Sequence, residues 1–178
     1  MADRRPPNLV LIGYRGSGKT TVGRGVADRL GFRLVDTDAL IVSEAGMPIA
    51  SIFEQEGESG FREREACVVR AVMDGEGQVV SMGGGAVLRD DNVACMRARG
   101  FVVWLTAPVE ALWRRIQADA ATEANRPALT LLPGIEEVEA VLAARTPRYR
   151  AAAHVEVDAS AELRLVAEAV LAAYGSSF

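Results

Sequence analysis

The eight residues from Gly13 to Thr20 constrain this sequence more than any other stretch. They read G-Y-R-G-S-G-K-T and match G-x-x-x-x-G-K-[ST], the pattern of a loop that binds nucleotide phosphates. The apolar run 8–12 before the loop is typical of a buried strand, and residues 21–30 after it carry apolar side chains at helical spacing. Strand, glycine loop and helix is the order that lets backbone N–H groups and a helix N-terminus surround a phosphate. The sequence therefore predicts a P-loop at this position.

Residues of the loop are expected to bind ATP and its magnesium ion. Lys19 would reach the β- and γ-phosphates, and the Thr20 hydroxyl would bind Mg²⁺. A glycine turn without a function is the alternative, and the strand and helix on either side argue against it. The predicted ATP site comprises Gly16, Ser17, Gly18, Lys19, Thr20 and Thr21.

The composition is that of a globular protein. Of the 178 residues, 49% are hydrophobic and 25% are charged, and the formal net charge is −4. The acidic balance argues against binding of nucleic acid through a basic surface, and no apolar run approaches the length of a membrane span. Residues 1–7 lack the apolar segment of a secretory signal. We expect one cytoplasmic domain over residues 1–178, monomeric by default, with no nucleic-acid or membrane partner.

Strand and helix patterns alternate along the chain. The five expected strands are each followed by a helical pattern, including helices over 49–55, 58–73 and 135–144, and Pro147 leaves the end of the last of these open. This alternation predicts a three-layer α/β fold with a central five-stranded parallel sheet and helices on both faces. Ligands of such sheets bind beyond the carboxyl ends of the strands. The expected strands cover residues 8–12, 32–35, 78–82, 101–105 and 155–157.

Asp36 and Asp38 flank Thr37 at the end of the second expected strand. In extended backbone, residues two apart point to the same side, so both carboxylates would face one site. One would lie near Mg²⁺ and the other near an acceptor hydroxyl. The alternative is a solvated turn in which Asp38 caps the next helix. Next to a phosphate loop, the functional interpretation is favoured.

Arg62 and the triple glycine at 83–85 are candidates for holding an acceptor. Glu65 lies three residues after Arg62, so it can fix the guanidinium for a bidentate contact with a carboxylate, although a solvated helix face is the alternative. Three glycines lose much backbone entropy on folding, which indicates a need for close approach or positive φ. A tight turn is one interpretation, and substrate lying against bare backbone is the other.

Two further arginines are candidates for binding anions. Arg126 lies in the helix-poor stretch 120–134, which we expect to be a mobile lid, and an arginine there can stabilise charge on a transferring phosphoryl group. Arg145 begins the basic cluster 145–150, which can form an anion pocket. Taken alone, Arg126 is better interpreted as a solvated side chain. His154 is the single histidine and has no partner for a catalytic triad or a zinc site, so a structural role is expected.

Together these motifs resemble the shikimate kinase family over essentially the whole chain. A phosphate loop by itself specifies only nucleotide phosphates, whereas the Gly-Glu-x-x-Phe-Arg run and the triple glycine are far more specific. The matching motifs are the loop 13–20, the D-x-D at 36–38, F-x-x-x-G-E-x-x-F-R-x-x-E over 53–65, G-G-G at 83–85, R-P at 126–127 and R-x-P-x-Y over 145–149.

The resemblance implies transfer of the ATP γ-phosphoryl group to the 3-hydroxyl of shikimate, in the biosynthesis of aromatic amino acids. It also implies a fold like that of nucleoside monophosphate kinases. Residues with implied roles in ATP and metal binding are Lys19 on phosphate, Thr20 and Asp36 on Mg²⁺, and Arg126 in the lid. Residues with implied roles at shikimate are Asp38 as hydroxyl ligand and candidate base, Gly84, Gly85, and the carboxylate-binding Arg62 and Arg145. No residue is assigned to the adenine base.

Two other functions compete with this interpretation. A related P-loop kinase could act on a gluconate-like or nucleotide acceptor, but two arginines predict a carboxylate, and the sequence offers no clear slot for a second base. A nucleotide-binding module without catalysis would bind ATP and turn over no acceptor. The complete set of expected catalytic groups argues against such a module.

Overall fold

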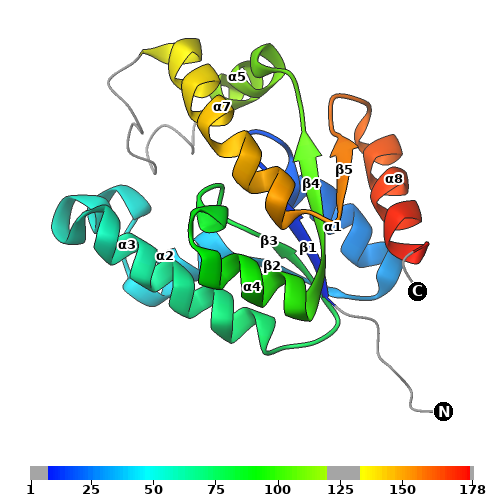
Figure 1. Ribbon diagram of the computed structural model, residues 1–178, viewed down its shortest axis with the longest axis horizontal. Coiled ribbons are helices and arrows are strands. Elements are labelled where there is room, and N and C mark those ends of the chain that lie inside the picture. The colour runs from blue at the N-terminus through cyan, green and yellow to red at the C-terminus, as the bar shows by residue number, and fades with distance from the viewer. Residues whose placement is uncertain (1–7, 120–132, 177–178) are drawn as a thin grey trace.

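The computed structural model describes residues 8–119 and 133–176. Strands and helices alternate along these ranges (Figure 1). The strands are β1 (Asn8–Ile12), β2 (Arg33–Asp36), β3 (Gln78–Ser81), β4 (Gly100–Thr106) and β5 (Val155–Asp158). The helices are α1 (Lys19–Leu30), α2 (Thr37–Ala45), α3 (Ile49–Met73), α4 (Asp90–Arg99), α5 (Val109–Ala118), α7 (Gly134–Ala152) and α8 (Leu163–Gly175), with a 3₁₀ turn η1 (Ala86–Leu88).

The strands form one parallel sheet in the order β2-β3-β1-β4-β5, as the alternation predicts. β1 is the central strand of this sheet. All five of its residues are buried and carry apolar or amide side chains, as expected of a strand that is covered on both faces. Leu11 pairs with Ser81 on one side, and Ile12 pairs with Trp104 on the other. The three loops that follow β1, β2 and β3 therefore emerge side by side at the carboxyl edge.

Helices cover both faces of the sheet, which gives the predicted three layers (Figure 1). Leu9 and Leu11 of β1 pack in an apolar cluster that contains residues of α1 and α8. Val10 and Ile12 point to the opposite face and pack with residues of α2, α3, α4 and the end of α7. The period of two along β1 thus assigns successive side chains to the two cores.

The two longest helices of the described ranges, α3 and α7, each contain a residue that disfavours helical backbone, Gly57 in α3 and Pro147 in α7. α3 breaks at Gly57, whose φ of 71° and ψ of −179° lie outside the helical region, so the two separate helices expected over 49–55 and 58–73 are confirmed. α7 continues through Pro147 to Ala152, which settles the end that the sequence left open. Tyr149, one turn before that end, is fully buried against Trp104, so tertiary packing maintains the helix beyond the proline.

The carboxyl edge of the sheet is covered by α5 and the first half of α7, which lie beyond the tip of β4 in Figure 1. They pack on Tyr14 of the phosphate loop in a third, smaller apolar cluster. None of the helices that the structure describes combines the length and the hydropathy that crossing a membrane requires.

Candidate active site

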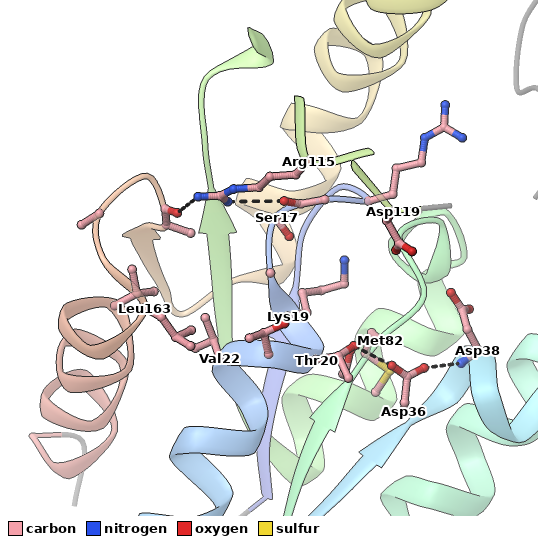
Figure 2. Close-up of a pocket in the computed structure, with 18 residues that line it drawn as sticks. Ser17, Lys19, Thr20, Val22, Asp36, Asp38, Met82, Arg115, Asp119 and Leu163 are labelled. Carbon is pink, nitrogen blue, oxygen red and sulfur yellow. Dashed lines mark hydrogen bonds between the residues drawn. The ribbon is translucent and has the colours of Figure 1, made fainter. Parts of the chain in front are cut away.

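The phosphate loop borders a cavity of about 450 Å³ at the carboxyl edge of the sheet (Figure 2). The loop adopts backbone conformations that favour glycine, with positive φ at Gly13, Gly16 and Gly18. A Cβ on Gly13 would also lie only 2.6 Å from the Leu105 carbonyl oxygen. The residues predicted to bind ATP all line this cavity, namely Gly16, Ser17, Gly18, Lys19, Thr20 and Thr21.

Lys19 stands in the first turn of α1, two residues earlier than the sequence placed the start of that helix. Its Nζ donates hydrogen bonds to the carbonyl oxygens of Gly13, at 2.8 Å, and Tyr14, at 3.0 Å. The Lys19 ammonium group therefore stabilises the conformation of the loop, and the Lys19 side chain lines the cavity (Figure 2).

Thr20, Asp36 and Ser81 bring three oxygen-bearing side chains together beneath the loop. The Thr20 hydroxyl donates to Asp36 Oδ2 at 2.7 Å and lies 3.1 Å from Ser81 Oγ. The described residues hold no group of three or more His, Cys, Asp or Glu that suits a metal ion. A hydroxyl and a single carboxylate nevertheless suit Mg²⁺, which takes few protein ligands and keeps several waters. Ser81 was not predicted, and no motif in the sequence marks it.

Asp36 and Asp38 meet at one site, but not by the geometry the sequence suggested. Asp36 ends β2, and its Oδ1 accepts the backbone N–H groups of Asp38, at 3.0 Å, and Ala39, at 3.2 Å. Asp36 is thus the N-cap of α2, and the alternative of Asp38 as the cap is wrong. Asp38 lies in the first helical turn rather than in extended backbone, and both carboxylates still line the first cavity.

A second, smaller cavity of about 60 Å³ adjoins the first. α2, α3, the turn after β3 and α7 contribute its polar wall, and Phe53 and Phe61 contribute an apolar one. The residues predicted to bind the acceptor all line it, namely Asp38, Arg62, Gly84, Gly85 and Arg145. Side chains more than a hundred residues apart in sequence therefore converge on one small pocket.

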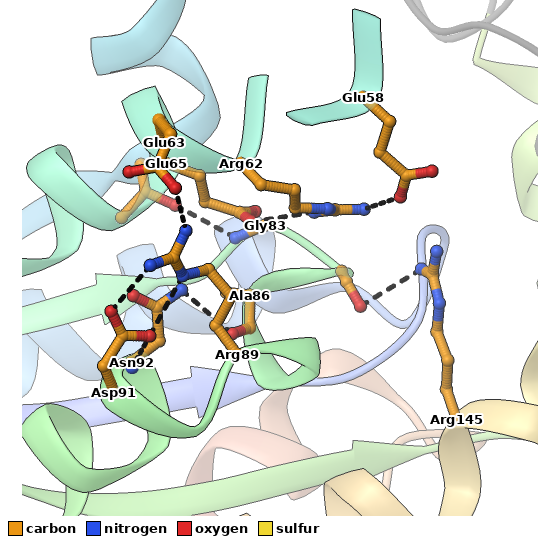
Figure 3. Close-up of polar contacts among 12 residues, drawn as sticks. Glu58, Arg62, Glu63, Glu65, Gly83, Ala86, Arg89, Asp91, Asn92 and Arg145 are labelled. Atoms are coloured by element: carbon orange, nitrogen blue, oxygen red, sulfur yellow. Dashed lines mark hydrogen bonds and ion pairs between the residues drawn. The ribbon is translucent and has the colours of Figure 1, made fainter. Parts of the chain in front are cut away.

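Among the described residues, three arginines line this cavity, and two of them, Arg62 and Arg145, are held by hydrogen bonds that Figure 3 shows. Arg62 Nη1 donates to Glu65 Oε2 at 2.7 Å, which confirms the predicted contact, and Nη2 lies 3.3 Å from Glu58 Oε1. The Glu65 side chain is 1% exposed, and this burial raises its pKa while the neighbouring Arg62 charge partly offsets the rise. Arg145 Nη1 donates to the Gly84 carbonyl oxygen at 3.2 Å.

The triple glycine is needed for space rather than for unusual φ. None of the three has a positive φ. A Cβ on Gly83 would lie 2.6 Å from Asp38 Oδ1, and a Cβ on Gly85 would overlap the Arg62 guanidinium. The close approach that the sequence predicted is therefore made by these two side chains, and Gly84 and Gly85 present bare backbone to the cavity.

Thr37 is a supporting residue that the sequence analysis missed. It is fully buried, and its hydroxyl accepts the Gly83 N–H at 2.9 Å and donates to the Ser81 carbonyl oxygen at 3.4 Å. This bridge ties the start of α2 to the glycine turn. The sequence marks Thr37 only by its position between two aspartates at the end of a strand.

Asp38 and Arg15 line both cavities within the described part of the chain. Asp38 thus stands where a phosphate bound in the first cavity meets a molecule bound in the second. Arg126, the expected lid arginine, lies outside the described residues. His154 is structural, as expected, because its Nδ1 accepts the Val102 N–H at 2.9 Å and its ring stacks on Phe101.

The far end of the first cavity was not assigned from the sequence. Arg115 of α5 donates to the Ala159 carbonyl oxygen at 2.8 Å and to the Gly16 carbonyl oxygen at 3.4 Å. Leu163 of α8 lies on the same side of the cavity in Figure 2, and Val166 of α8 also lines the cavity. Arg115 and these apolar side chains make this part of the cavity lining less polar than the phosphate loop.

A phosphate loop on a parallel five-stranded sheet, beside a small cavity with fixed arginines, defines the class of P-loop small-molecule kinases. A family model described as "Shikimate kinase" matches residues 15–174. A shikimate kinase of Symbiobacterium thermophilum is 47% identical over 150 residues, which cover 84% of this chain and 85% of that relative. The chain belongs to the shikimate kinase family.

Solved structures agree with this assignment. A shikimate kinase from Acinetobacter baumannii, solved in complex with shikimate, superposes with a TM-score of 0.89 at 36% identity, over 96% of this chain and 94% of the other. A gluconokinase from Sinorhizobium meliloti has a TM-score of 0.60 at 18% identity, over 97% of this chain and 94% of the other. The second similarity shows a shared fold and does not extend to the acceptor.

Proposed function

We propose that the protein transfers the γ-phosphoryl group of ATP to the 3-hydroxyl of shikimate, which yields shikimate 3-phosphate and ADP in aromatic amino-acid biosynthesis. One observation carries the proposal: Asp38 lines both the phosphate-loop cavity and the neighbouring pocket, into which Arg62 and Arg145 bring guanidinium groups held by hydrogen bonds. Shikimate is a small carboxylate with hydroxyls, so it needs cationic donors at one end and a carboxylate beside its reacting oxygen. Membership of the shikimate kinase family supports the same acceptor.

ATP binds along the first cavity. Backbone N–H groups of the loop and Lys19 hold the phosphates, and Thr20 and Asp36 hold Mg²⁺. When bound, Mg²⁺ neutralises charge on the phosphate oxygens. The adenine lies at the other end, between Arg115 and the side chains of Leu163 and Val166, because a flat base buries its faces against apolar and guanidinium surfaces.

Shikimate binds in the second cavity. Arg62 and Arg145 bind its carboxylate, because a guanidinium fork matches two carboxylate oxygens. Gly84 and Gly85 let the ring approach the backbone. Asp38 binds the 3-hydroxyl and accepts its proton as the oxygen bonds to phosphorus.

Most of the rate enhancement then comes from alignment and charge neutralisation. Phosphoryl transfer needs little covalent help from the protein, so fixing two substrates in line supplies most of the effect. Arg126 is proposed as the lid arginine that stabilises the transferring group. We also propose that residues 1–178 form one cytoplasmic kinase domain that acts as a monomer, with a lid at about 120–134.

An acceptor-dependent ADP assay tests the proposal. The protein is incubated with ATP and Mg²⁺, alone and with shikimate, gluconate or a nucleoside monophosphate. We expect ADP formation with shikimate that exceeds each control by at least about 100-fold, because a site built to pair polar groups rejects acceptors that leave them unpaired. ADP formation with gluconate or a nucleotide instead would keep the P-loop kinase class and reject the acceptor. Tight ATP binding without turnover of any acceptor would favour a binding module.

A further inference from the structure

Two phosphate-loop residues, Tyr14 and Arg15, contact the helices α5 and α7 that cover the loop. Tyr14 is buried and packs with Leu112, Val138 and Val141, in an apolar cluster separate from the two cores on the sheet faces. Arg15 Nη2 forms an ion pair with Glu137 Oε1 of α7 at 2.9 Å. Both contacts join segments more than ninety residues apart, and neither belongs to the chemistry proposed above.

The Arg15–Glu137 pair is sheltered from solvent. The two side chains are 14% and 8% exposed, so their attraction is screened far less than that of a surface pair. Arg15 Nε is buried without a hydrogen-bond partner in the described ranges, and its guanidinium lies 5.7 Å from the centre of the Tyr14 ring. The ion pair with Glu137 therefore holds this guanidinium in its orientation.

The same helix carries a residue of the acceptor cavity. Arg145 follows Glu137 by eight residues, about 12 Å along the helix axis. It donates to the Gly84 carbonyl oxygen and lines the second cavity (Figure 3). Arg15 itself lines both cavities. A continuous set of contacts thus runs from the phosphate loop through Arg15, Glu137 and α7 to Arg145.

Building on the proposed function, we propose that Arg15 and Glu137 are positioning residues that make shikimate binding depend on nucleotide in the phosphate loop. Phosphate bound by the loop N–H groups fixes the backbone at Arg15. Through its ion pair with Glu137, Arg15 then fixes the position of α7. This position places the Arg145 guanidinium where it can bind the acceptor carboxylate. Neither residue acts on the reacting atoms. The coupling is a free energy shared by two sites, so it is measurable by binding alone.

Titration calorimetry of shikimate, with and without saturating Mg-ADP, tests this role. For the unsubstituted protein we expect Mg-ADP to tighten shikimate binding about tenfold, in the usual range of coupling between sites. Glu137→Gln should reduce that ratio to below about twofold and leave the shikimate dissociation constant without nucleotide nearly unchanged, since a neutral amide cannot hold the guanidinium as firmly. Glu139→Gln removes the same charge from the exposed side of the same helix and should retain the full ratio.

A second variant guards against a folding defect. Arg15→Lys keeps the charge but loses the planar fork, so it should also lower the ratio while the thermal midpoint stays near that of the unsubstituted protein. A ratio near one in the unsubstituted protein would overturn the proposal. So would a full ratio in Glu137→Gln, or a lowered thermal midpoint in both variants with the ratio intact. Absence of shikimate binding and turnover in the unsubstituted protein would instead reject the proposed function.

Discussion

Asp38 is the central residue of the proposed reaction, because its side chain lines both cavities. Its backbone N–H binds the cap Asp36, so the start of α2 fixes its position, and the Thr37 bridge fixes α2 against the glycine turn. The D-x-D motif was sufficient to predict that both carboxylates serve one site. It was not sufficient to predict how, because the strand ends at Asp36 and the helix begins at Thr37.

Replacing Asp38 with asparagine should separate catalysis from nucleotide binding. Asparagine keeps the size of the side chain but cannot take the proton of the acceptor hydroxyl, so we expect kcat to fall about 10²- to 10⁴-fold. The KM for ATP should change less than about twofold, since the phosphate loop is intact. Steady-state kinetics with both substrates varied provides the measurement. A kcat within about threefold of the original would remove Asp38 from the mechanism.

Arg62 should control affinity for the acceptor. Arg62→Lys replaces a bidentate fork with a point charge, so the KM for shikimate should rise about tenfold while the KM for ATP stays constant. Arg89→Lys is the matched control, because Arg89 also pairs with a glutamate of α3, Glu63, but lines neither cavity (Figure 3). An unchanged shikimate KM in Arg62→Lys would place Arg62 outside the acceptor site.

The helices show which local signals in a sequence are reliable. Gly57 interrupts α3 because its φ of 71° favours glycine, and the sequence predicted that break. Pro147, in contrast, left the end of its helix open in the sequence, and α7 continues through it to Ala152. The difference is physical: a proline removes one hydrogen bond, and burial of Tyr149 against Trp104 offsets that loss. Packing of this kind cannot be derived from local sequence.

Two glycine-to-alanine variants should change stability in opposite directions. A Cβ at either Gly57 or Gly25 meets nothing within 4 Å, so backbone conformation alone decides the effect. Gly57→Ala places alanine at φ 71° and ψ −179°, a backbone region that is almost restricted to glycine, and should lower the free energy of unfolding by about 1–3 kcal/mol. Gly25→Ala lies inside α1 and should raise it by about 0.5–1 kcal/mol. Urea unfolding measures both changes. A stabilising Gly57→Ala would contradict the observed break.

Across the molecule as a whole, the fold could be predicted from the sequence more fully than the contacts that complete the site. The phosphate loop with its flanks, and five strand patterns each followed by a helix, were enough for the parallel sheet and for the loops that carry the site. The strand order was not predicted. The Arg15–Glu137 pair and the contact of Arg115 with Gly16 were also missed, because they join residues 122 and 99 positions apart that share no local pattern.

His154 should make the stability of the protein depend on pH. His154 stands directly before β5 and connects it to β4. Its backbone N–H donates to the Val102 carbonyl oxygen, and its ring Nδ1 accepts the backbone N–H of Val102. Burial, and secondarily the Arg97 charge, lower the pKa of His154 below 6.5. The unfolded chain then binds a proton more readily, so stability should fall as pH drops through about 6.5 and remain constant above it.

Comparison with His154→Gln isolates this contribution. The difference in free energy of unfolding between the original protein and the variant should shrink as pH is lowered from 7 to 5, because glutamine does not titrate. Urea unfolding at several pH values gives the difference directly. A difference that stays constant over this range would show that His154 titrates alike in the folded and unfolded states.

The most direct test of the proposed reaction is the structure of its product. Nuclear magnetic resonance of a mixture of ATP, Mg²⁺, shikimate and protein should show a new phosphate monoester, with phosphorus coupled to the proton at C3 and ADP formed in equal amount. That result would place the acceptor oxygen beside Asp38, with the carboxylate held by Arg62 and Arg145. Phosphorylation at another hydroxyl, or release of inorganic phosphate alone, would contradict the assignment of the two cavities.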